Sequence, residues 1–122
     1  MKKLLIFASS LLVFWLSTLS FGQIQIESGK WGVSLSYSGY TLDKNQGERN
    51  VLIDISFEVP FDKKPDIMLA VTTYDGSNQA NTRFNVESRS VSRDGFTIKV
   101  VTWADSKIFG IGGYWIAHVK KN

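Results

Sequence analysis

Residues 51–57 read Val-Leu-Ile-Asp-Ile-Ser-Phe, and this stretch decides the fold class. Its odd-numbered positions are all apolar, and Asp54 and Ser56 stand between them. A period of two is the pattern of a β-strand with one face in the core and one in solvent. Pro60 and Pro65 follow, and because proline is excluded from central strands, the strand must end before them.

The same period recurs along the chain, and no segment shows a helical period. We expect turns at residues 75–77, 93–95 and 110–113, where Asp and Gly gather, and a polar loop over residues 38–50. The expected strands besides the first are residues 24–27, 32–37, 67–71, 82–92, 96–103 and 113–119. Six or seven short strands predict an all-β domain, a small antiparallel sandwich.

The leading segment has the composition of a signal peptide. Two lysines precede an apolar run, Leu4–Leu19, and small residues, Ser20 and Gly22, occupy the positions that a signal peptidase reads. We therefore expect residues 1–22 to be a signal peptide and the protein to be secreted, to the extracellular space or the periplasm. A retained membrane anchor is the alternative, but this run is shorter than the roughly 20 apolar residues of a membrane span.

Cleavage before Gln23 leaves one domain, residues 23–122. Loss of the two leading lysines lowers the net charge from +3 to +1, so nothing in the charge favours binding to nucleic acid or to an anionic membrane. The chain has no cysteine, and a lone histidine, His118, is a poor metal or catalytic site. We expect no metal, no other cofactor and no membrane insertion after cleavage.

The register of the hairpin over residues 82–103 decides which side chains meet. A three-residue turn, Arg93–Asp94–Gly95, with Gly95 in the left-handed region would pair Ser92 with Phe96. A two-residue turn would mix polar and apolar side chains on both faces, so we prefer the first register, although it places Arg89 opposite Lys99. Its core face would carry Phe84, Val86, Phe96, Ile98 and Val100.

On the outward face this register places Arg83 opposite Asp105, and Trp103 opposite Asn85. A guanidinium offers several donors in one plane, a carboxylate accepts hydroxyl protons, and an indole offers an apolar surface to the C–H groups of a sugar. These four residues form a candidate carbohydrate site. The alternative is structural: an Arg–Asp pair that closes the end of a sheet, with the indole covering the core.

Several short motifs along the chain resemble those of the H-type lectin domain family, in the same order and spacing. They are Ile55–Ser56–Phe57, Pro60–Phe61, Pro65, Asn81–Thr82–Arg83, Val91–Ser92, Gly95–Phe96, Thr102–Trp103 and Tyr114–Trp115–Ile116–Ala117. The resemblance covers nearly all of residues 23–122.

This resemblance implies a six-stranded antiparallel β-sandwich that assembles as a homotrimer. It also implies binding of glycans with terminal galactose or N-acetylgalactosamine in clefts between subunits. In the family, an Arg at the position of Arg83 donates hydrogen bonds to the sugar, while a Trp at the position of Trp103 and an aromatic residue at the position of Phe109 line the cleft. An acidic residue in the loop before the first long strand binds ring hydroxyls.

The chain departs from the family at three positions of the implied site. Phe109 replaces a Tyr, and Ala104 replaces a sugar-contacting His, of a snail lectin of the family. The acidic position falls on Gln46, with Asp43 and Glu48 on either side. We expect Asp43 to supply the carboxylate, and we include Gln46 among the candidate sugar contacts.

Two other functions remain open on the sequence alone. The domain could be a structural or adhesion module that keeps the sandwich but has lost sugar binding, since a fold does not guarantee its site. A glycoside hydrolase would need a general acid and a second carboxylate flanking the scissile bond, and the sequence shows no convincing pair. We therefore expect a binding protein and not an enzyme.

Overall fold

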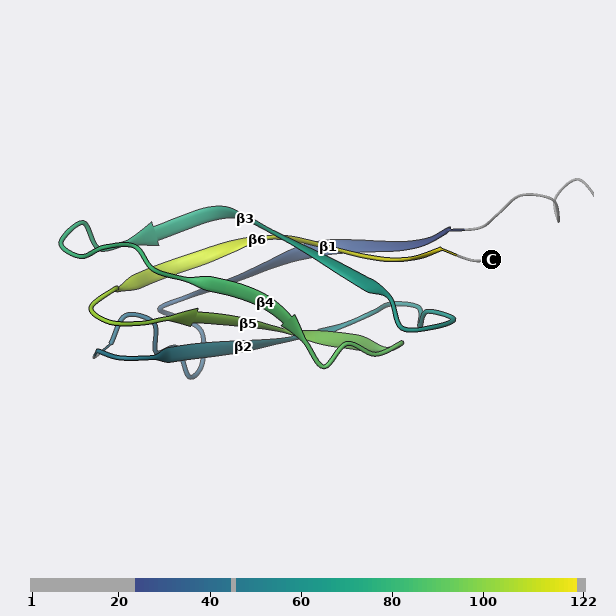
Figure 1. Cartoon of the computed structure of the whole chain (residues 1–122), viewed down its shortest axis with the longest axis horizontal. Helices are drawn as coiled ribbons and strands as arrows, with labels where there is room; N and C mark the ends of the chain where they lie inside the picture. The colour runs from purple at the N-terminus through teal and green to yellow at the C-terminus, as the bar shows by residue number, and fades with distance from the viewer. Residues whose placement is uncertain (1–23, 45, 121–122) are drawn as a thin grey trace, which may run out of the picture.

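The computed structural model describes residues 24–44 and 46–120, which form two antiparallel three-stranded sheets packed face to face (Figure 1). The expected all-β, six-stranded sandwich is confirmed. The expected signal peptide, residues 1–22, lies outside the described residues. The strands are β1 (Ile24–Ser34), β2 (Arg49–Ser56), β3 (Asp66–Gly76), β4 (Asn85–Arg89), β5 (Gly95–Thr102) and β6 (Ile108–Lys120).

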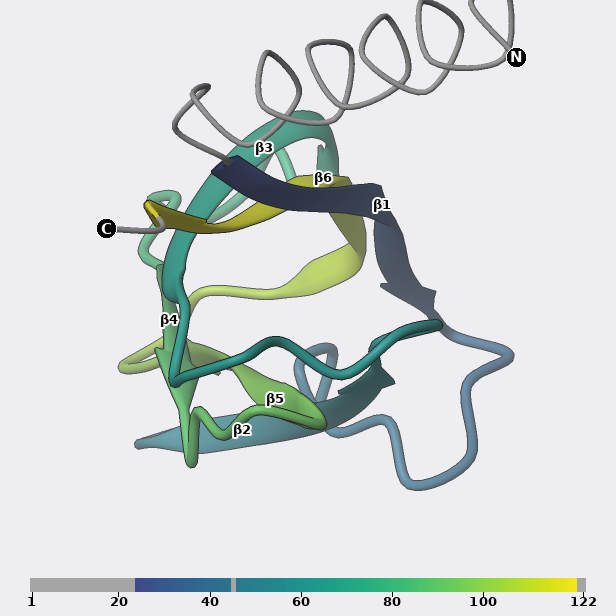
Figure 2. The ribbon, with the colours of Figure 1, turned by 90° about the vertical axis from the view of Figure 1, so that its right-hand side faces the viewer.

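The first sheet has the strand order β1-β6-β3 and the second has the order β2-β5-β4 (Figure 2). Because every pairing is antiparallel, three connections meet at one end of the sandwich: residues 35–48, 77–84 and 103–107. We call this the loop end. The other connections, 57–65 and 90–94, lie with the C-terminal end of β6 at the opposite end (Figure 1). Within the described residues, no helix is long and apolar enough to span a membrane.

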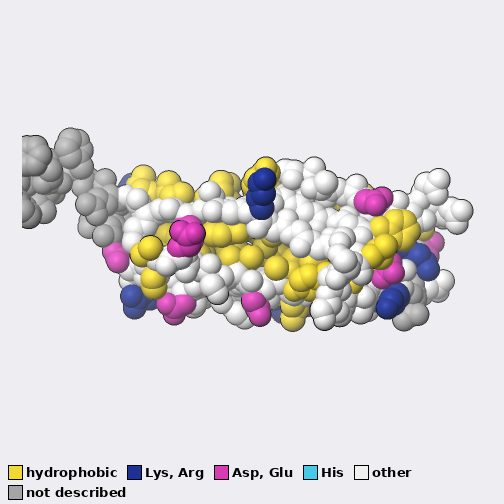
Figure 3. Space-filling view, turned by 180° about the vertical axis from the view of Figure 1, so that it is seen from behind, with side chains coloured by type: hydrophobic (Ala, Val, Ile, Leu, Met, Phe, Trp, Pro, Cys, Tyr) yellow, Lys and Arg dark blue, Asp and Glu magenta, His cyan; other side chains and the backbone are white. Residues whose placement is uncertain are grey.

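The core lies between the two sheets and contains residues from both. Hydrophobic side chains are visible along the middle of the face shown in Figure 3. Ile98 and Val100 of β5 are fully buried, as expected for the predicted core face. At the end of the sandwich opposite the loop end, Trp115 of β6 packs against Phe57 and Phe96, with ring centroids 5.8 Å and 5.5 Å away. Burial of several large aromatic rings stabilises a small domain whose sequence contains no cysteine.

The hairpin between β4 and β5 keeps the predicted faces but not the predicted register. Glu87 pairs with Lys99, and Arg89 pairs with Thr97, so the expected Arg89–Lys99 pair is absent. Ser90, with a φ of 52°, takes the left-handed conformation that we expected of Gly95, and the loop is longer than three residues. A slip of two residues leaves every side chain on its original face, because side chains alternate with a period of two.

The glycine-rich segment 110–113 is a strand and not the expected turn. It belongs to β6, the central strand of the first sheet. A Cβ at Gly112 would lie 2.7 Å from the carbonyl oxygen of Trp31, and one at Gly113 would collide with the carbonyl oxygen of Ala70. These glycines therefore permit a close approach of neighbouring backbones. The expected strands 24–27 and 32–37 are likewise one strand, β1.

The outward faces of the two sheets differ in character. On the first sheet the outward face carries exposed apolar side chains from all three strands: Ile24, Ile26, Met68, Tyr114 and Ile116. We call this set the apolar face. The outward face of the second sheet is largely polar, and there Thr97 donates a 2.9 Å hydrogen bond to Asp54. On this second outward face, Leu52 of β2 is an exposed apolar residue.

The substitution Gly113→Ala is expected to lower the free energy of unfolding by about 1–3 kcal/mol, because the added methyl group overlaps the backbone of β3. Urea denaturation measures the change. The control is Ser56→Ala at an exposed strand position of β2 on the other sheet. There we expect a change below about 1 kcal/mol. Equal losses for the two variants would contradict the close-approach explanation.

Candidate functional site

The loop end gathers most of the residues that the sequence singled out. Arg83 lies on the connection before β4, and Asn85 is the first residue of β4. Trp103 and Asp105 lie on the connection between β5 and β6. The antiparallel topology brings these two segments together although about twenty positions separate them in the sequence.

Arg83 and Asp105 form an ion pair, with Nη1 2.6 Å from Oδ1. The predicted contact is thus present, although it is made by two loops and not by opposed strand residues. Arg83 Nη1 also donates to the hydroxyl of Ser106 at 3.3 Å. The Arg83 side chain is 28% exposed, and its Nε and Nη2 have no hydrogen-bond partner among the described residues. Those groups are available to an acceptor in solution.

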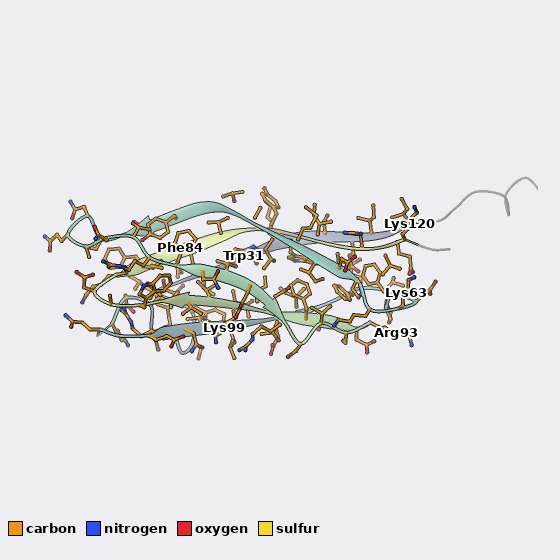
Figure 4. All side chains as sticks on the ribbon, viewed as in Figure 1. Trp31, Lys63, Phe84, Arg93, Lys99 and Lys120 are labelled. Carbon is orange, nitrogen blue, oxygen red and sulfur yellow. The ribbon has the colours of Figure 1, made fainter. Side chains whose placement is uncertain are left out.

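Trp103 stands at the mouth of a cavity of about 460 Å³ on the outward face of the second sheet. The indole is 42% exposed, which is unusual for so large an apolar ring. Asn85 lines the same cavity, but it pairs with Val101 of β5, so the expected pairing of Asn85 with Trp103 is wrong. The buried Val101 and Lys99 of β5 also line it. Figure 4 labels the side chain of Lys99. The cavity thus combines an aromatic surface with polar groups, a combination that suits a sugar ring.

Two acidic residues lie at this cavity, and Asp43 is not one of them. Glu48 and Glu87 line it, whereas Asp43 and Gln46 do not. Asp43 lies near Tyr40 instead, and its Oδ1 is buried without a hydrogen-bond partner among the described residues. Burial, followed by this nearby carboxylate, raises the pKa of Tyr40 above its ordinary value. Gln46 is exposed.

Phe109 does not line the Trp103 cavity of its own chain. It is the second residue of β6 in the first sheet, it is partly buried, and its carbonyl accepts a 3.2 Å hydrogen bond from the amide of Leu35. A cleft that contains both aromatic residues therefore needs a surface beyond this single chain.

Arg49 is the residue that the sequence analysis missed. Its side chain is only 8% exposed, and its guanidinium donates to the main-chain carbonyls of Gly47 at 2.9 Å and Lys44 at 2.7 Å. It also donates to those of Ser106 at 2.9 Å and Ala104 at 2.8 Å. The sequence shows only an arginine immediately after a polar loop. It reveals neither that the side chain is buried nor which distant carbonyls accept its hydrogen bonds.

The described residues contain no cluster of three or more His, Cys, Asp or Glu side chains able to hold a metal ion. The loop end carries hydrogen-bond donors and acceptors, charged groups and an aromatic surface.

Comparison with known proteins assigns the chain to a family. The sequence pattern of the H-type lectin domain matches residues 52–118, which is more than half of the chain. The chain belongs to the H-type lectin domain family. This match includes Arg83, Trp103 and Phe109 and excludes the 35–48 connection.

Two curated proteins are similar in sequence. One chain of discoidin-1 from Dictyostelium discoideum is 27% identical over 77 residues, which are 62% of this chain and 30% of that protein. A protein of Fuscovulum blasticum, described as ATP synthase subunits region ORF 7, is 27% identical over 71 residues, which are 58% of this chain and 62% of that protein. The chain thus matches less than two thirds of either relative.

Solved structures show the same fold. Recombinant discoidin II of Dictyostelium discoideum superposes with a TM-score of 0.73 at 17% identity, over 84% of this chain and 40% of that one. Wild-type discoidin II gives the same TM-score at 16% identity, over 84% and 39%. The two-sheet sandwich is therefore a discoidin-like fold.

Proposed function

We propose that this protein is a secreted lectin that binds glycans with terminal galactose or N-acetylgalactosamine at the loop end. The observation that carries the proposal is the exposed indole of Trp103 beside a polar cavity, with the Arg83–Asp105 pair on the adjoining loop. Membership of a lectin family favours binding over catalysis. The signal peptide expected at residues 1–22 supports secretion.

In the proposed complex the apolar C–H surface of the sugar packs on Trp103. The free guanidinium N–H groups of Arg83 donate to ring hydroxyls, while Asp105 holds that guanidinium in place. Glu48, which lines the cavity, accepts hydroxyl protons. We thereby assign to Glu48 the role first expected of Asp43, and we give Gln46 no direct part.

We also propose that the domain assembles as a homotrimer through the apolar face and that a neighbouring subunit completes each cleft. Five exposed apolar side chains on one sheet favour burial against another surface. The same outward face continues into a groove of about 530 Å³ whose floor includes Gly32, Gly110 and Gly112. A Cβ at Gly32 or Gly110 would meet nothing closer than 3.6 Å, so packing within the chain does not explain these two glycines. Glycine in a strand often marks the close approach of another chain.

Arg83→Ala and Trp103→Ala are each expected to abolish retention on galactose or N-acetylgalactosamine resin. The first removes the donors, and the second removes the stacking surface. The control is Arg93→Ala at the opposite end of the sandwich, where the side chain donates to the carbonyl of Phe61 and does not line the cavity. Retention of either variant at the wild-type level would refute the site.

The pair Glu48→Gln and Asp43→Asn separates the two acidic candidates. We expect Glu48→Gln to weaken sugar binding by about ten-fold, because it removes a charged acceptor from the cavity. Asp43→Asn should leave the affinity within about two-fold, since this side chain lies outside the cavity. Calorimetric titration measures both. The reverse order of effects would restore Asp43 as the contact.

Ile116→Lys places a charge at the centre of the apolar face and is expected to convert the trimer to monomers. Asp94→Lys, in the exposed connection between β4 and β5 at the end opposite the cleft, is the control and should remain trimeric. Light scattering coupled to size exclusion gives the masses. A monomeric wild-type protein, or dissociation by Asp94→Lys alone, would overturn this assignment of the interface.

A further inference from the structure

We propose that Arg49 is a positioning residue for the sugar site, holding its loops in the binding arrangement before the ligand arrives. This inference rests on the proposed function, because it concerns the same site. It gives a role to the buried guanidinium, which touches no part of the Trp103 cavity.

The acceptors of Arg49 lie on two different connections. The carbonyls of Lys44 and Gly47 belong to residues 35–48, and those of Ala104 and Ser106 belong to residues 103–107. Because these four acceptors among the described residues are main-chain atoms, the guanidinium sets the path of both backbones. A planar group with five donors is suited to span two segments in this way.

A direct backbone hydrogen bond joins the same two connections. The amide of Gly47 donates to the carbonyl of Ala104 at 3.1 Å, so this carbonyl accepts from both Gly47 and Arg49. Ala104 has a φ of 55°, and a residue with a side chain rarely adopts this left-handed conformation. Such a conformation persists where surrounding contacts enforce it, and here the two donors hold the carbonyl of Ala104 in place.

Ser106 extends the arrangement to the third connection. It is fully buried, and its hydroxyl donates to the carbonyl of Asn81 and accepts from Arg83 Nη1. Thr102, also fully buried, donates from its hydroxyl to the carbonyl of Arg83 at 2.5 Å. Arg49 therefore fixes the backbone of the residue whose side chain in turn positions Arg83.

Three residues of the proposed site stand next to anchored residues in the sequence. Glu48 lies between Gly47 and Arg49, and Trp103 and Asp105 flank Ala104. Without the guanidinium, the two loops would sample other arrangements, and the sugar would have to order them on binding. That ordering cost lowers affinity even though no atom in contact with the ligand has changed.

A purely structural arginine is the competing explanation, and Arg93 provides the matched control. Its Nε donates to the main-chain carbonyl of Phe61 at 2.8 Å, at the end of the sandwich opposite the loop end (Figure 4). Both arginines thus join a connection to a distant carbonyl, but only Arg49 does so beside the proposed site.

The test compares Arg49→Met, Arg49→Lys and Arg93→Met in the assembled protein, titrated with galactose and N-acetylgalactosamine. We expect Arg49→Met to weaken binding at least about ten-fold while thermal unfolding stays cooperative, and Arg49→Lys to weaken it about three-fold. Arg93→Met should bind within about two-fold of wild type. Equal affinities for Arg49→Met and Arg93→Met would overturn the proposal. If Arg49→Met does not fold, wild-type affinity for Arg49→Lys would overturn it instead.

Amide hydrogen exchange without sugar tests the positioning role by itself. In Arg49→Lys we expect faster exchange at the amide of Gly47, which donates a hydrogen bond to the carbonyl of Ala104. We expect unchanged exchange in the β1–β6 ladder. Uniform change across the chain, or none at Gly47, would contradict it. Selective acceleration in a protein whose wild type binds neither sugar would uphold the positioning role and refute the proposed function.

Discussion

The arrangement of the loop end depends on one buried guanidinium. Arg49 donates to main-chain carbonyls of two connections, and Ser106 extends the same network to the third connection, which carries Arg83. A buried charge is tolerated only when hydrogen bonds replace its hydration, and the carbonyls of these loops supply them. The loops and the arginine therefore stabilise one another. The same hydrogen bonds hold the solvent-facing residues of these loops in place in a chain that contains no cysteine.

Much of the fold could be predicted from alternation alone. Residues 51–57 and the other segments with a period of two form strands with one face toward the core and one toward solvent. The core face of the hairpin was assigned correctly at Ile98 and Val100. The register was wrong because a sequence does not reveal which residue of a turn adopts a positive φ; Ser90 did so in place of Gly95. The faces were nevertheless correct, because a slip of two residues preserves them. The turn predicted at residues 110–113 was wrong for a different reason. Glycine is favoured both in turns and where two backbones approach closely, and the sequence does not distinguish the two.

The candidate site was predicted in part. Trp103 and Asn85 line one cavity although Asn85 pairs with Val101, and Arg83 meets Asp105 through two loops to which the strand register does not apply. The acidic contact could not be assigned, because spacing within an irregular loop does not determine which side chains face solvent. Asp43 lies near Tyr40 with its Oδ1 buried, and Glu48 lines the cavity. The role of Arg49 could not be predicted, because some of its acceptors, such as the carbonyl of Ser106, lie far from it in the sequence.

The central claim is that a sugar binds where three anchored loops meet. The most direct measurement is an NMR titration of the isotope-labelled domain, residues 23–122, with galactose and N-acetylgalactosamine. We expect saturable shifts at the Trp103 indole N–H, the Arg83 side chain and the amides of Gly47 and Glu48, with residues 57–65 and 90–94 at the opposite end unaffected. Shifts confined to that opposite end, or none at millimolar sugar, would contradict sugar binding at the loop end.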